Sequence, residues 1–357
     1  MTEPPTIFLT GFPGFIAGRL IRRLARDGAR FFLLAQPAFA ERARAEVALI
    51  AAETGRPVAD FQLMEGDITL PDLGLRAADL AVVQAETTLL YHLAAIYDLA
   101  VPRAPALRVN VEGTRNVNAL AVRLPRLAFY HYISTCYVAG QRAGLVRENE
   151  LRHEAGFRNY YEETKYLAEL EVEALKDKLP VVIHRPSVVC GDSRTGETAK
   201  YDGIYYLINF MRRWPRVFSR FNVGNDIVRA NLVPVDFVVE ALAALAQDER
   251  ALGHTLQLAD PAPLTTRAIF DAIAGVLAGH KSSATLPMAL SQTALTMPFT
   301  PALTGMPLTA APYFFLEQIY DTQVASELLA ARGVACPPYD SYVKTLIDFV
   351  AEHPKLG

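Results

Sequence analysis

Cysteine is scarce in this sequence, and its three copies stand far apart. Cys136, Cys190 and Cys336 show no C-x-x-C spacing within the 357 residues. Isolated thiols exclude a disulfide framework and a zinc ribbon, and they indicate reduced, partly buried cysteines in a cytoplasmic protein. The seven histidines form no H-x-x-x-H or H-E-x-x-H pair. No metal site is therefore predicted.

The sequence also lacks an excess of either charge. The 35 Lys and Arg and the 38 Asp and Glu leave a net charge of −3, which gives no electrostatic reason to expect nucleic acid or an anionic membrane as a partner. The opening residues, MTEPPTIFLTG, lack the basic and apolar order of a signal peptide, so a cytoplasmic location is predicted.

One long stretch has no charge at all. From Ser282 to Leu316 there is no Asp, Glu, Lys or Arg. A membrane-spanning helix needs about 20 mostly apolar residues in succession, and five prolines interrupt this segment: Pro287, Pro298, Pro301, Pro307 and Pro312. We interpret it as a buried wall of a substrate-binding lobe, with peripheral membrane contact as the alternative.

What the sequence does contain is a regular alternation of apolar strands and helices. Helices are expected at 15–28, 38–55, around 105–122 and 157–178, between strand-like runs at 6–10, 30–35, 60–67, 86–95, 127–135 and 179–187. This order predicts an α/β fold of the Rossmann type, a doubly wound parallel sheet with a smaller C-terminal substrate lobe.

The rhythm of elements changes after Ser187, which suggests where the lobes divide. We expect a nucleotide-binding domain over 1–190, joined again by about 228–259, where NLVPVDFVVEALAALAQ and HTLQLAD resume the strand–helix pattern. The substrate lobe would be built from 191–227 and 260–357.

A glycine-rich turn joins the first expected strand to the first helix. TGFPGFIAG places Gly11, Gly14 and Ala17 at the G-x-x-G-x-x-[GA] spacing. Glycine permits a tight turn in which backbone N–H groups approach a pyrophosphate at the positive end of a helix. Because strand, turn and helix follow in the required order, dinucleotide binding is predicted in preference to a purely structural turn.

The end of the second expected strand bears on which dinucleotide is bound. An acidic residue there would bind the ribose 2′-hydroxyl of NAD, but the chain has Ala35-Gln36-Pro37. Arg19, Arg42 and Arg44 are nearby cations that could hold a 2′-phosphate, although each could equally belong to a solvated helix face. NADPH is favoured, and NADH stays open.

Several motifs stand in one order, and together they resemble the extended short-chain dehydrogenase/reductase family over about 260 residues. YISTCYVAG, YEETKYLAE and HRPSVVCGDSRTGE are most similar to its fatty acyl-CoA reductase and thioester reductase branch, of the male sterility type. The ordered motifs are Thr10-Gly11-x-x-Gly14, Asp67-Ile68, His92-Leu93-Ala94-Ala95, Asn110-Val111-x-Gly113-Thr114, Ser134-Thr135, Tyr161-x-x-x-Lys165 and Arg185-Pro186-Ser187.

The resemblance implies a role for each matching residue. Tyr161 would be the acid that protonates a carbonyl oxygen, Thr135 would hydrogen-bond the same oxygen, with Ser134 as the substitute if the register slips by one, and Lys165 would hold the nicotinamide ribose. The implied cofactor-binding residues are Thr10, Gly11, Gly14, Phe15, Ile16, Asp67, Ile68, Leu93, Ala94, Ala95, Asn110, Tyr161, Lys165, Pro186, Ser187 and Val188.

Elementary chemistry supports the same catalytic set. A tyrosine has an ordinary pKa of about 10, so cycling its proton at neutral pH calls for a nearby cation, and Lys165, four residues on along one helix face, is expected to lower the pKa of Tyr161. A hydroxyl aimed at the developing oxyanion adds electrostatic stabilisation.

The resemblance also implies a substrate, namely an acyl thioester (acyl-CoA or acyl carrier) reduced to an aldehyde or alcohol, and it leaves a homodimer open. A ketone or aldehyde reductase, or a 3-hydroxy dehydrogenase on a lipid-like or steroid-like molecule, is the first alternative. A nucleotide-sugar epimerase or dehydratase would need basic residues in the small lobe, where Arg212, Arg213, Arg216, Arg220 and Arg229 stand. A non-catalytic nucleotide-binding subunit is the last alternative, and it has no need of the catalytic set.

Overall fold

The computed structural model describes residues 4–297, 300–301 and 305–356. Its centre is a parallel sheet of seven strands in the order β11-β7-β5-β4-β1-β2-β3. The strands are β1 (Thr6–Thr10), β2 (Arg30–Ala35), β3 (Phe61–Glu65), β4 (Leu89–His92), β5 (Phe129–Ile133), β7 (Val181–Pro186) and β11 (Thr255–Leu258).

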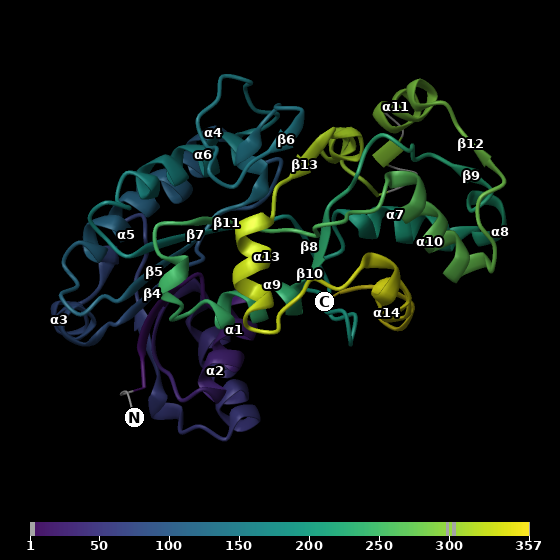
Figure 1. Cartoon of the computed structure of the whole chain (residues 1–357). Helices are drawn as coiled ribbons and strands as arrows, with labels where there is room; N and C mark the ends of the chain where they lie inside the picture. Colours follow the sequence, from purple (N-terminus) through teal and green to yellow (C-terminus); the bar gives the residue numbers. More distant parts are fainter. Residues whose placement is uncertain (1–3, 298–299, 302–304, 357) are drawn as a thin grey trace.

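Helices cover both faces of this sheet because both faces are apolar (Figure 1). Along β1, Ile7 and Leu9 face one core and Phe8 faces the other, as the alternation of a strand requires. The first core lies under α1 (Phe15–Arg26), α2 (Ala40–Thr54) and α9 (Val235–Ala244), and the second under α3 (Ala77–Glu86), α5 (Gly113–Ala121) and α6 (Tyr160–Glu173). The predicted Rossmann-type α/β fold is confirmed.

The helix expected around 105–122 is divided in three. α4 (Arg103–Ala106) is followed by a π-helical turn, η4 (Leu107–Glu112), and then by α5. Gly113 lies where α5 approaches the loop after β3, since a Cβ there would be 2.6 Å from Cδ1 of Ile68. The glycine of the N-V-x-G-T motif therefore allows close packing of this helix.

Figure 1 shows the helices of the smaller lobe apart from the seven-stranded sheet. This lobe has its own apolar core. It is formed by α7 (Ile204–Arg213), α10 (Thr266–Ala278) and α14 (Tyr339–Glu352), and it meets the sheet lobe at the parallel pair β8–β10. The remaining elements are β6 (Gly144–Val146), β8 (Val188–Cys190), α8 (Pro215–Phe218), β9 (Phe221–Asn222), β10 (Leu232–Pro234), β12 (Ala284–Thr285), α11 (Met288–Thr296), β13 (Gln318–Tyr320), α13 (Gln323–Ala330) and the short turns η1 (Pro37–Phe39), η2 (Val58–Asp60), η3 (Pro71–Gly74), η5 (Cys136–Ala139), η6 (Glu249–Ala251) and η7 (Leu308–Phe315).

Part of the segment 260–357 packs on the sheet lobe, which changes the predicted division of the chain. β13 pairs with β6, and Leu328 and Leu329 of α13 enter the core under α1 and α9. The buried carboxylate of Glu148 accepts hydrogen bonds from the N–H groups of Val324 and Ala325, at 2.7 and 3.2 Å, and so caps α13. Residues 318–330 thus belong with the sheet.

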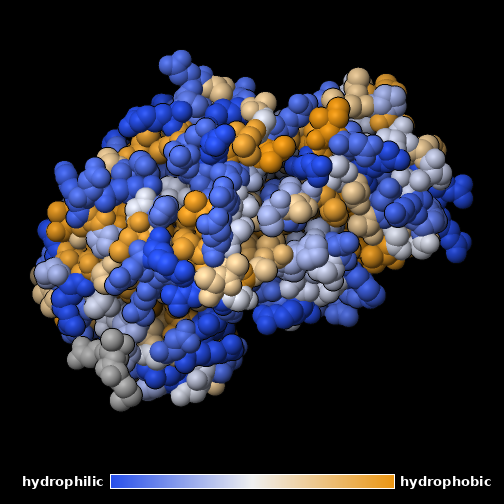
Figure 2. Space-filling view, in the orientation of Figure 1, coloured by the Kyte–Doolittle hydropathy of each residue, from blue (hydrophilic) through white to orange (hydrophobic). Residues whose placement is uncertain are grey.

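The charge-free stretch is less buried than expected. Leu290, Met297 and Leu308 are 58%, 39% and 42% exposed, while residues between Met306 and Phe314 form a small cluster against α7. Figure 2 shows hydrophobic side chains on the surface where this part of the small lobe faces the sheet lobe. Residues 298–299 and 302–304 of the stretch lie outside the described residues. Over the described ranges, no helix combines the length and the apolar character needed to cross a membrane.

Replacement of Leu329 by Ala tests the assignment of α13 to the sheet lobe. Leu329 is 3% exposed, so the substitution should lower the free energy of unfolding by about 2–5 kcal/mol through lost burial and a residual cavity. Urea unfolding measures this change. The control is Leu49→Ala in α2, where the side chain is 53% exposed and an effect within about 0.5 kcal/mol is expected. Equal effects of the two substitutions would contradict the packing described.

Candidate active site

The implied site residues gather at the carboxyl edge of the sheet, where parallel α/β folds bind their ligands. Thr10 ends β1 and is paired with His92, which ends β4. Leu93, Ala94 and Ala95 follow directly, half-buried. Thr135 follows β5, Pro186 ends β7, and Tyr161 and Lys165 lie on α6 beside them. Five separate segments thus contribute to one edge.

The glycine turn has the shape that a bound pyrophosphate requires. Gly11 has φ +92°, and a Cβ there would lie 2.8 Å from the Ala94 nitrogen, while a Cβ on Gly14 would lie 2.6 Å from the Gly11 oxygen. Neither position accepts a side chain. Phe15 and Ile16 open α1 directly after the turn, so the first turn of the helix points free N–H groups at this place. The residues present fit a dinucleotide.

A buried histidine joins the motifs of β1, β4 and η4. His92 is 1% exposed, and burial, with a smaller effect of Lys165, lowers its pKa to about 3. The Thr114 hydroxyl donates to the Asn110 carbonyl at 2.6 Å, so His92 Nε2 donates to Thr114 Oγ1 (3.0 Å) and Nδ1 accepts from Thr10 Oγ1 (2.8 Å). The histidine is neutral and structural.

The side chain of Asn110, which is expected to bind the cofactor, hydrogen-bonds two other segments of the protein. Its Oδ1 accepts from the Ile96 N–H at 2.8 Å, and its Nδ2 donates to the Ile96 carbonyl and to the Thr164 hydroxyl, both at 3.0 Å. It therefore ties the loop after β4 to α6. Its contribution to the site is to position these two segments.

The two neighbouring hydroxyls after β5 have different partners. Ser134 donates to the buried carboxylate of Glu169, whereas the Thr135 hydroxyl lies close enough to the phenol of Tyr161 to affect its pKa. Thr135 also begins η5, and its Oγ1 accepts from the Tyr137 N–H at 3.2 Å. This geometry favours Thr135 over Ser134 as the residue that shares an oxygen with Tyr161.

Lys165 is buried, and its ammonium contacts β5. Its ammonium donates to the Tyr132 hydroxyl at 2.9 Å and to the Ile133 carbonyl at 2.8 Å, and it is 3% exposed. Burial lowers its pKa to about 7, against a smaller opposing effect of Glu169. The lysine therefore carries a proton that can be exchanged near neutral pH.

The expected lowering of the Tyr161 pKa by Lys165 is not found in this structure. Burial raises the pKa of Tyr161 to about 12, and the hydrogen bond from Thr135 opposes the rise only in part. The physical reason is that the ammonium of Lys165 points at Tyr132 and Ile133, so desolvation dominates. In this state Tyr161 is a protonated phenol, the form that a proton donor needs.

Below α6, the helix that carries Tyr161 and Lys165, lies a buried ion pair. Arg185 of β7 and Glu169 of α6 are 1% and 0% exposed, with 2.5 Å between Nη2 and Oε1 and 2.9 Å between Nε and Oε1. Arg185 also donates to the carbonyls of Glu148 and Glu150, at 3.4 and 3.0 Å. Arg185 thereby fixes α6 relative to β7 and to the loop after β6.

At the other side of the glycine turn, the residues near the expected adenosine end bond to one another. Gln36 donates to the carboxylate of Asp67 at 2.9 Å, and the Thr69 N–H donates to the same carboxylate at 2.8 Å. Arg42 donates to the Pro13 carbonyl at 3.0 Å, which places its cation beside the turn. Ile68 is buried against Gly113.

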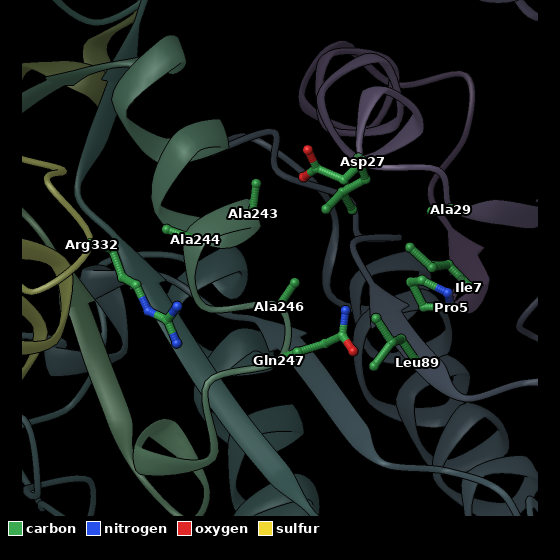
Figure 3. A pocket seen from close by; sticks show the side chains of 11 residues that line it. Pro5, Ile7, Asp27, Ala29, Leu89, Ala243, Ala244, Ala246, Gln247 and Arg332 are labelled. Carbon is green, nitrogen blue, oxygen red and sulfur yellow. The ribbon is translucent and has the colours of Figure 1, made fainter. Parts of the chain in front are cut away.

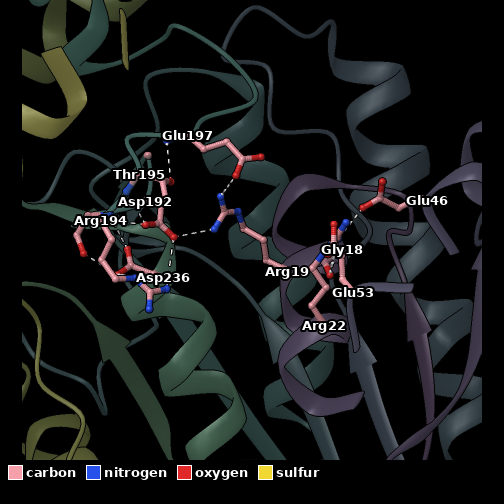
Figure 4. Close-up of polar contacts among 12 residues, drawn as sticks. Gly18, Arg19, Arg22, Glu46, Glu53, Asp192, Arg194, Thr195, Glu197 and Asp236 are labelled. Atoms are coloured by element: carbon pink, nitrogen blue, oxygen red, sulfur yellow. Dashed lines mark hydrogen bonds and ion pairs between the residues drawn. The ribbon is translucent and has the colours of Figure 1, made fainter. Parts of the chain in front are cut away.

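Arg19, one of the three candidate cations, is engaged elsewhere (Figure 4). It pairs with Asp192 at 2.8 Å and with Glu197 in the loop after β8, and its guanidinium carbon lies 4.8 Å from the centroid of the Phe15 ring. Burial alone would raise the pKa of Asp192, but backbone N–H groups and Arg19 together lower it. Arg19 links the two lobes, and Arg42 is the better candidate for a 2′-phosphate.

The segment after β7 is fixed to the small lobe through Asn231. The Ser187 hydroxyl donates to Asn231 Oδ1 at 2.7 Å, and the Val188 N–H donates to the Asn231 carbonyl at 3.3 Å. The amide of Asn231 donates in turn to the Asp260 carbonyl at 2.8 Å. Pro186, Ser187 and Val188 therefore form a rigid wall at the junction of the lobes.

A cavity of about 200 Å³ opens at the opposite, amino-terminal edge of the sheet, away from these residues (Figure 3). Pro5, Ile7 and Leu89 line it, with Gln247 and Arg332 at its rim. It has no part in the candidate site, because the binding loops follow the other ends of the strands. Among the residues that the structure describes, no three His, Cys, Asp or Glu side chains come together as a metal site.

Sequence reasoning missed several residues that organise this site. Asn159 and Glu162 form the helix start N-x-x-E, and that spacing is a recognisable capping pattern. Glu169 stands four residues after Lys165, on the same helix face. Tyr313 and Asn231 carry no local signal, because their partners are distant in the chain.

Comparisons with known proteins agree with this geometry. A fatty acyl-CoA reductase of Drosophila melanogaster is 26% identical over 282 residues, which cover 68% of this chain and 54% of that protein. A glycine betaine reductase of Emericella nidulans is 26% identical over 291 residues, 76% of this chain and 22% of that protein. The chain thus spans about half of one relative and about a fifth of the other.

Solved structures show the same fold. The terminal R domain of the myxalamid PKS-NRPS biosynthetic pathway superposes with a TM-score of 0.83 at 24% identity, covering 99% of this chain and 92% of the other. UDP-glucuronic acid 4-epimerase from Bacillus cereus superposes with a TM-score of 0.66 at 18% identity, covering 99% and 98%.

The seven-stranded parallel sheet, the glycine turn and the Thr135–Tyr161–Lys165 arrangement define an NAD(P)-binding protein of the extended short-chain dehydrogenase/reductase type. The profile of the family described as male sterility protein matches residues 9–242, and the chain belongs to that family.

Replacement of Glu169 by Gln should destabilise the protein strongly. The substitution removes the anionic partner of a guanidinium that is 1% exposed, and such losses cost about 3 kcal/mol or more in the free energy of unfolding. Urea unfolding of Glu171→Gln provides the control, because Glu171 forms an exposed pair with Arg115 and should change stability by less than about 1 kcal/mol. Similar values for both substitutions would refute the special role of the buried pair.

Lys165 should also make stability depend on pH. Its folded pKa of about 7 lies below the ordinary 10.5, so from about pH 7 to pH 10 the unfolded chain binds more protons and the free energy of unfolding rises with pH. Chemical unfolding between these limits should show this slope in the wild type and its loss in Lys165→Met. The exposed Lys344→Met substitution should leave it intact, and an unchanged slope in Lys165→Met would be the contrary result.

Proposed function

We propose that this chain is an NADPH-dependent oxidoreductase that reduces the carbonyl of a hydrophobic acyl thioester, acyl-CoA or an acyl carrier, to an aldehyde or alcohol. The observation that carries the proposal is that the Thr135 hydroxyl lies close enough to the Tyr161 phenol to oppose the rise of its pKa. It brings together two donors from different elements beside Lys165 and the glycine turn. The reductases named among the relatives support the acyl substrate.

The chemistry assigned to the protein is positioning and proton transfer. The bound nicotinamide would supply a hydride to the carbonyl carbon. As the carbonyl oxygen gains charge, Thr135 donates a hydrogen bond to it and Tyr161 gives it a proton. With a thioester, the C–S bond of the resulting thiohemiacetal then breaks, the hydroxyl proton leaves, and a thiol and an aldehyde are formed. A second reduction of the aldehyde would give the alcohol.

Lys165 has two tasks in this proposal. The first is to hold the nicotinamide ribose, as the resemblance implies. For the second, its pKa of about 7 suits a group that returns a proton near neutral pH. The bonds to Tyr132 and Ile133 hold the lysine beside the carboxyl end of β5.

The preference for NADPH rests on the end of β2. Gln36 stands where an acidic residue would bind the 2′-hydroxyl of NAD, and it binds Asp67, whose carboxylate also accepts the Thr69 N–H. Arg42 supplies a cation within hydrogen-bonding distance of the glycine turn, and an arginine is well suited to a phosphate.

The test is the oxidation of NADPH, and separately of NADH, with four substrates: a long-chain acyl-CoA, a long-chain aldehyde, an apolar ketone and a nucleotide sugar. Oxidation with the acyl-CoA supports the proposal, and the aldehyde result says whether reduction continues to the alcohol. Turnover of the aldehyde or ketone alone would reject the thioester substrate and leave a carbonyl reductase. Conversion of the nucleotide sugar without net oxidation would replace the proposal by an epimerase.

Replacement of Tyr161 by Phe should lower kcat by about 10²–10⁴-fold, because the proton donor is lost, while NADPH binding measured by fluorescence titration stays unchanged. The matched control is Tyr160→Phe, since Tyr160 is 45% exposed and stands one residue earlier on the same helix. Its kcat should equal that of the wild type. Full turnover by Tyr161→Phe would exclude the assigned chemistry.

A further inference from the structure

The helix that carries Tyr161 and Lys165 begins with a reciprocal cap. Asn159 precedes the helix, and its Oδ1 accepts from the Glu162 N–H at 3.0 Å. The Glu162 carboxylate accepts from the Arg158 N–H at 2.9 Å. Such a cap fixes the first turn, and Tyr161 is the second residue of that turn.

A side chain from the other lobe completes this cap. Tyr313 lies in η7, the part of the charge-free stretch that packs on α7. Asn159 Nδ2 donates to the Tyr313 hydroxyl at 2.7 Å, and that hydroxyl donates to Oε1 of Glu162. Glu162 is 0% exposed, and the Arg158 guanidinium also pairs with its carboxylate at 3.4 Å. Asn159, Tyr313 and Glu162 form a closed ring of hydrogen bonds at the start of α6, and the Glu162 N–H closes it on Asn159.

The ring of Tyr313 contacts the segment that holds Thr135. The rings of Tyr137 and Tyr313 lie with centroids 4.6 Å apart, and the Tyr137 N–H donates to Thr135 Oγ1 at 3.2 Å. Tyr313 thus contacts, on one side, the residue after Tyr161 and, on the other, the residue bonded to Thr135. A single residue therefore lies between Tyr313 and each of the two donors: Glu162 on the side of Tyr161, and Tyr137 on the side of Thr135.

We propose that Tyr313 is a positioning residue for the reduction: it sets the spacing between the Thr135 hydroxyl and the Tyr161 phenol that a single carbonyl oxygen requires. The inference rests on the proposed function and deepens it. Thr135 directly precedes η5, and Tyr161 lies in α6. These are separate segments of the chain, so a side chain that contacts both can fix the distance between the two donors. Catalytic groups must be held within about 0.5 Å of the productive geometry, and a misplacement of about 1 Å can cost about 10²-fold in rate.

A tyrosine that only stabilised the fold would give a different result when it is replaced. Its loss would lower the thermal midpoint of unfolding and weaken cofactor and substrate binding along with the rate. A positioning residue acts on the chemical step, so kcat falls while KM for the carbonyl substrate and Kd for NADPH hold.

The experiment compares Tyr313→Phe, Asn159→Ser and the double variant with the wild type, using the acyl-CoA and the aldehyde. Tyr313→Phe keeps the ring and removes the hydroxyl. Asn159→Ser keeps a good helix cap and removes the amide that donates to Tyr313. We expect each to lower kcat about 10-fold or more, with KM and NADPH Kd within about twofold, and the double variant to be no slower than Tyr313→Phe, because both break one network.

The matched control is Tyr339→Phe. Tyr339 is 2% exposed, and within the described part of the chain its hydroxyl has no hydrogen-bond partner. It lies in α14, outside the site, so its kcat should equal that of the wild type. A tyrosine hydroxyl is thereby removed from the small lobe without touching the cap.

Two results would overturn the inference. One is a kcat of Tyr313→Phe within twofold of the wild type. The other is a parallel loss of stability, NADPH binding and rate in Tyr313→Phe, which would make it a structural prop. Failure of the proposed function is distinguishable from both, because it appears as absent acyl-CoA and aldehyde turnover in the wild type, or as full turnover in Tyr161→Phe.

Discussion

The buried ion pair between Arg185 and Glu169 is the contact on which the site depends. Two charges that are 1% and 0% exposed are tolerated only with each other and with further hydrogen bonds. Arg185 satisfies its remaining donors on the carbonyls of Glu148 and Glu150, and Glu169 accepts from Ser134. β5, β7, α6 and the loop after β6 therefore meet at one point. α6 cannot shift along the sheet without separating Glu169 from Arg185.

From this anchor the site extends to the junction of the two lobes. Arg19 reaches from the helix of the glycine turn to the loop after β8. Asn231 fixes the wall formed by Ser187 and Val188 to the residues of the small lobe. Tyr313 returns from the small lobe to the start of α6. Polar contacts between the lobes thus surround the residues proposed for catalysis. A change in how one lobe packs on the other would therefore change the distances between these residues.

Burial determines the protonation of the site as much as charge does. Tyr161 is held as a phenol because desolvation outweighs the hydrogen bond from Thr135. Desolvation also lowers the pKa of Lys165 to about 7. The two shifts bring the pKa of Lys165 closer to neutral pH and take the pKa of Tyr161 further from it. This suits the proposed roles of a phenol that donates a proton and an ammonium beside it that returns one. The chemistry of a Tyr and a Lys on one helix face predicted the opposite shift of the Tyr161 pKa, because it made the charge of Lys165 the dominant effect.

The sequence by itself determined the Rossmann-type fold, the glycine turn and the family, because these depend on local patterns: strand alternation, helix periodicity, and glycines in a position that admits no side chain. It also placed Tyr161 and Lys165 on one helix face and favoured Thr135 over Ser134. Only the tertiary structure showed that these two adjacent hydroxyls have different surroundings, Ser134 beside Glu169 and Thr135 beside Tyr161. It alone showed that Asn110 and Ser187 bind other parts of the protein, that 318–330 packs on the sheet, and that Tyr313 reaches Glu162 across 151 residues. Contacts between distant segments depend on how helices pack, and no local pattern records them.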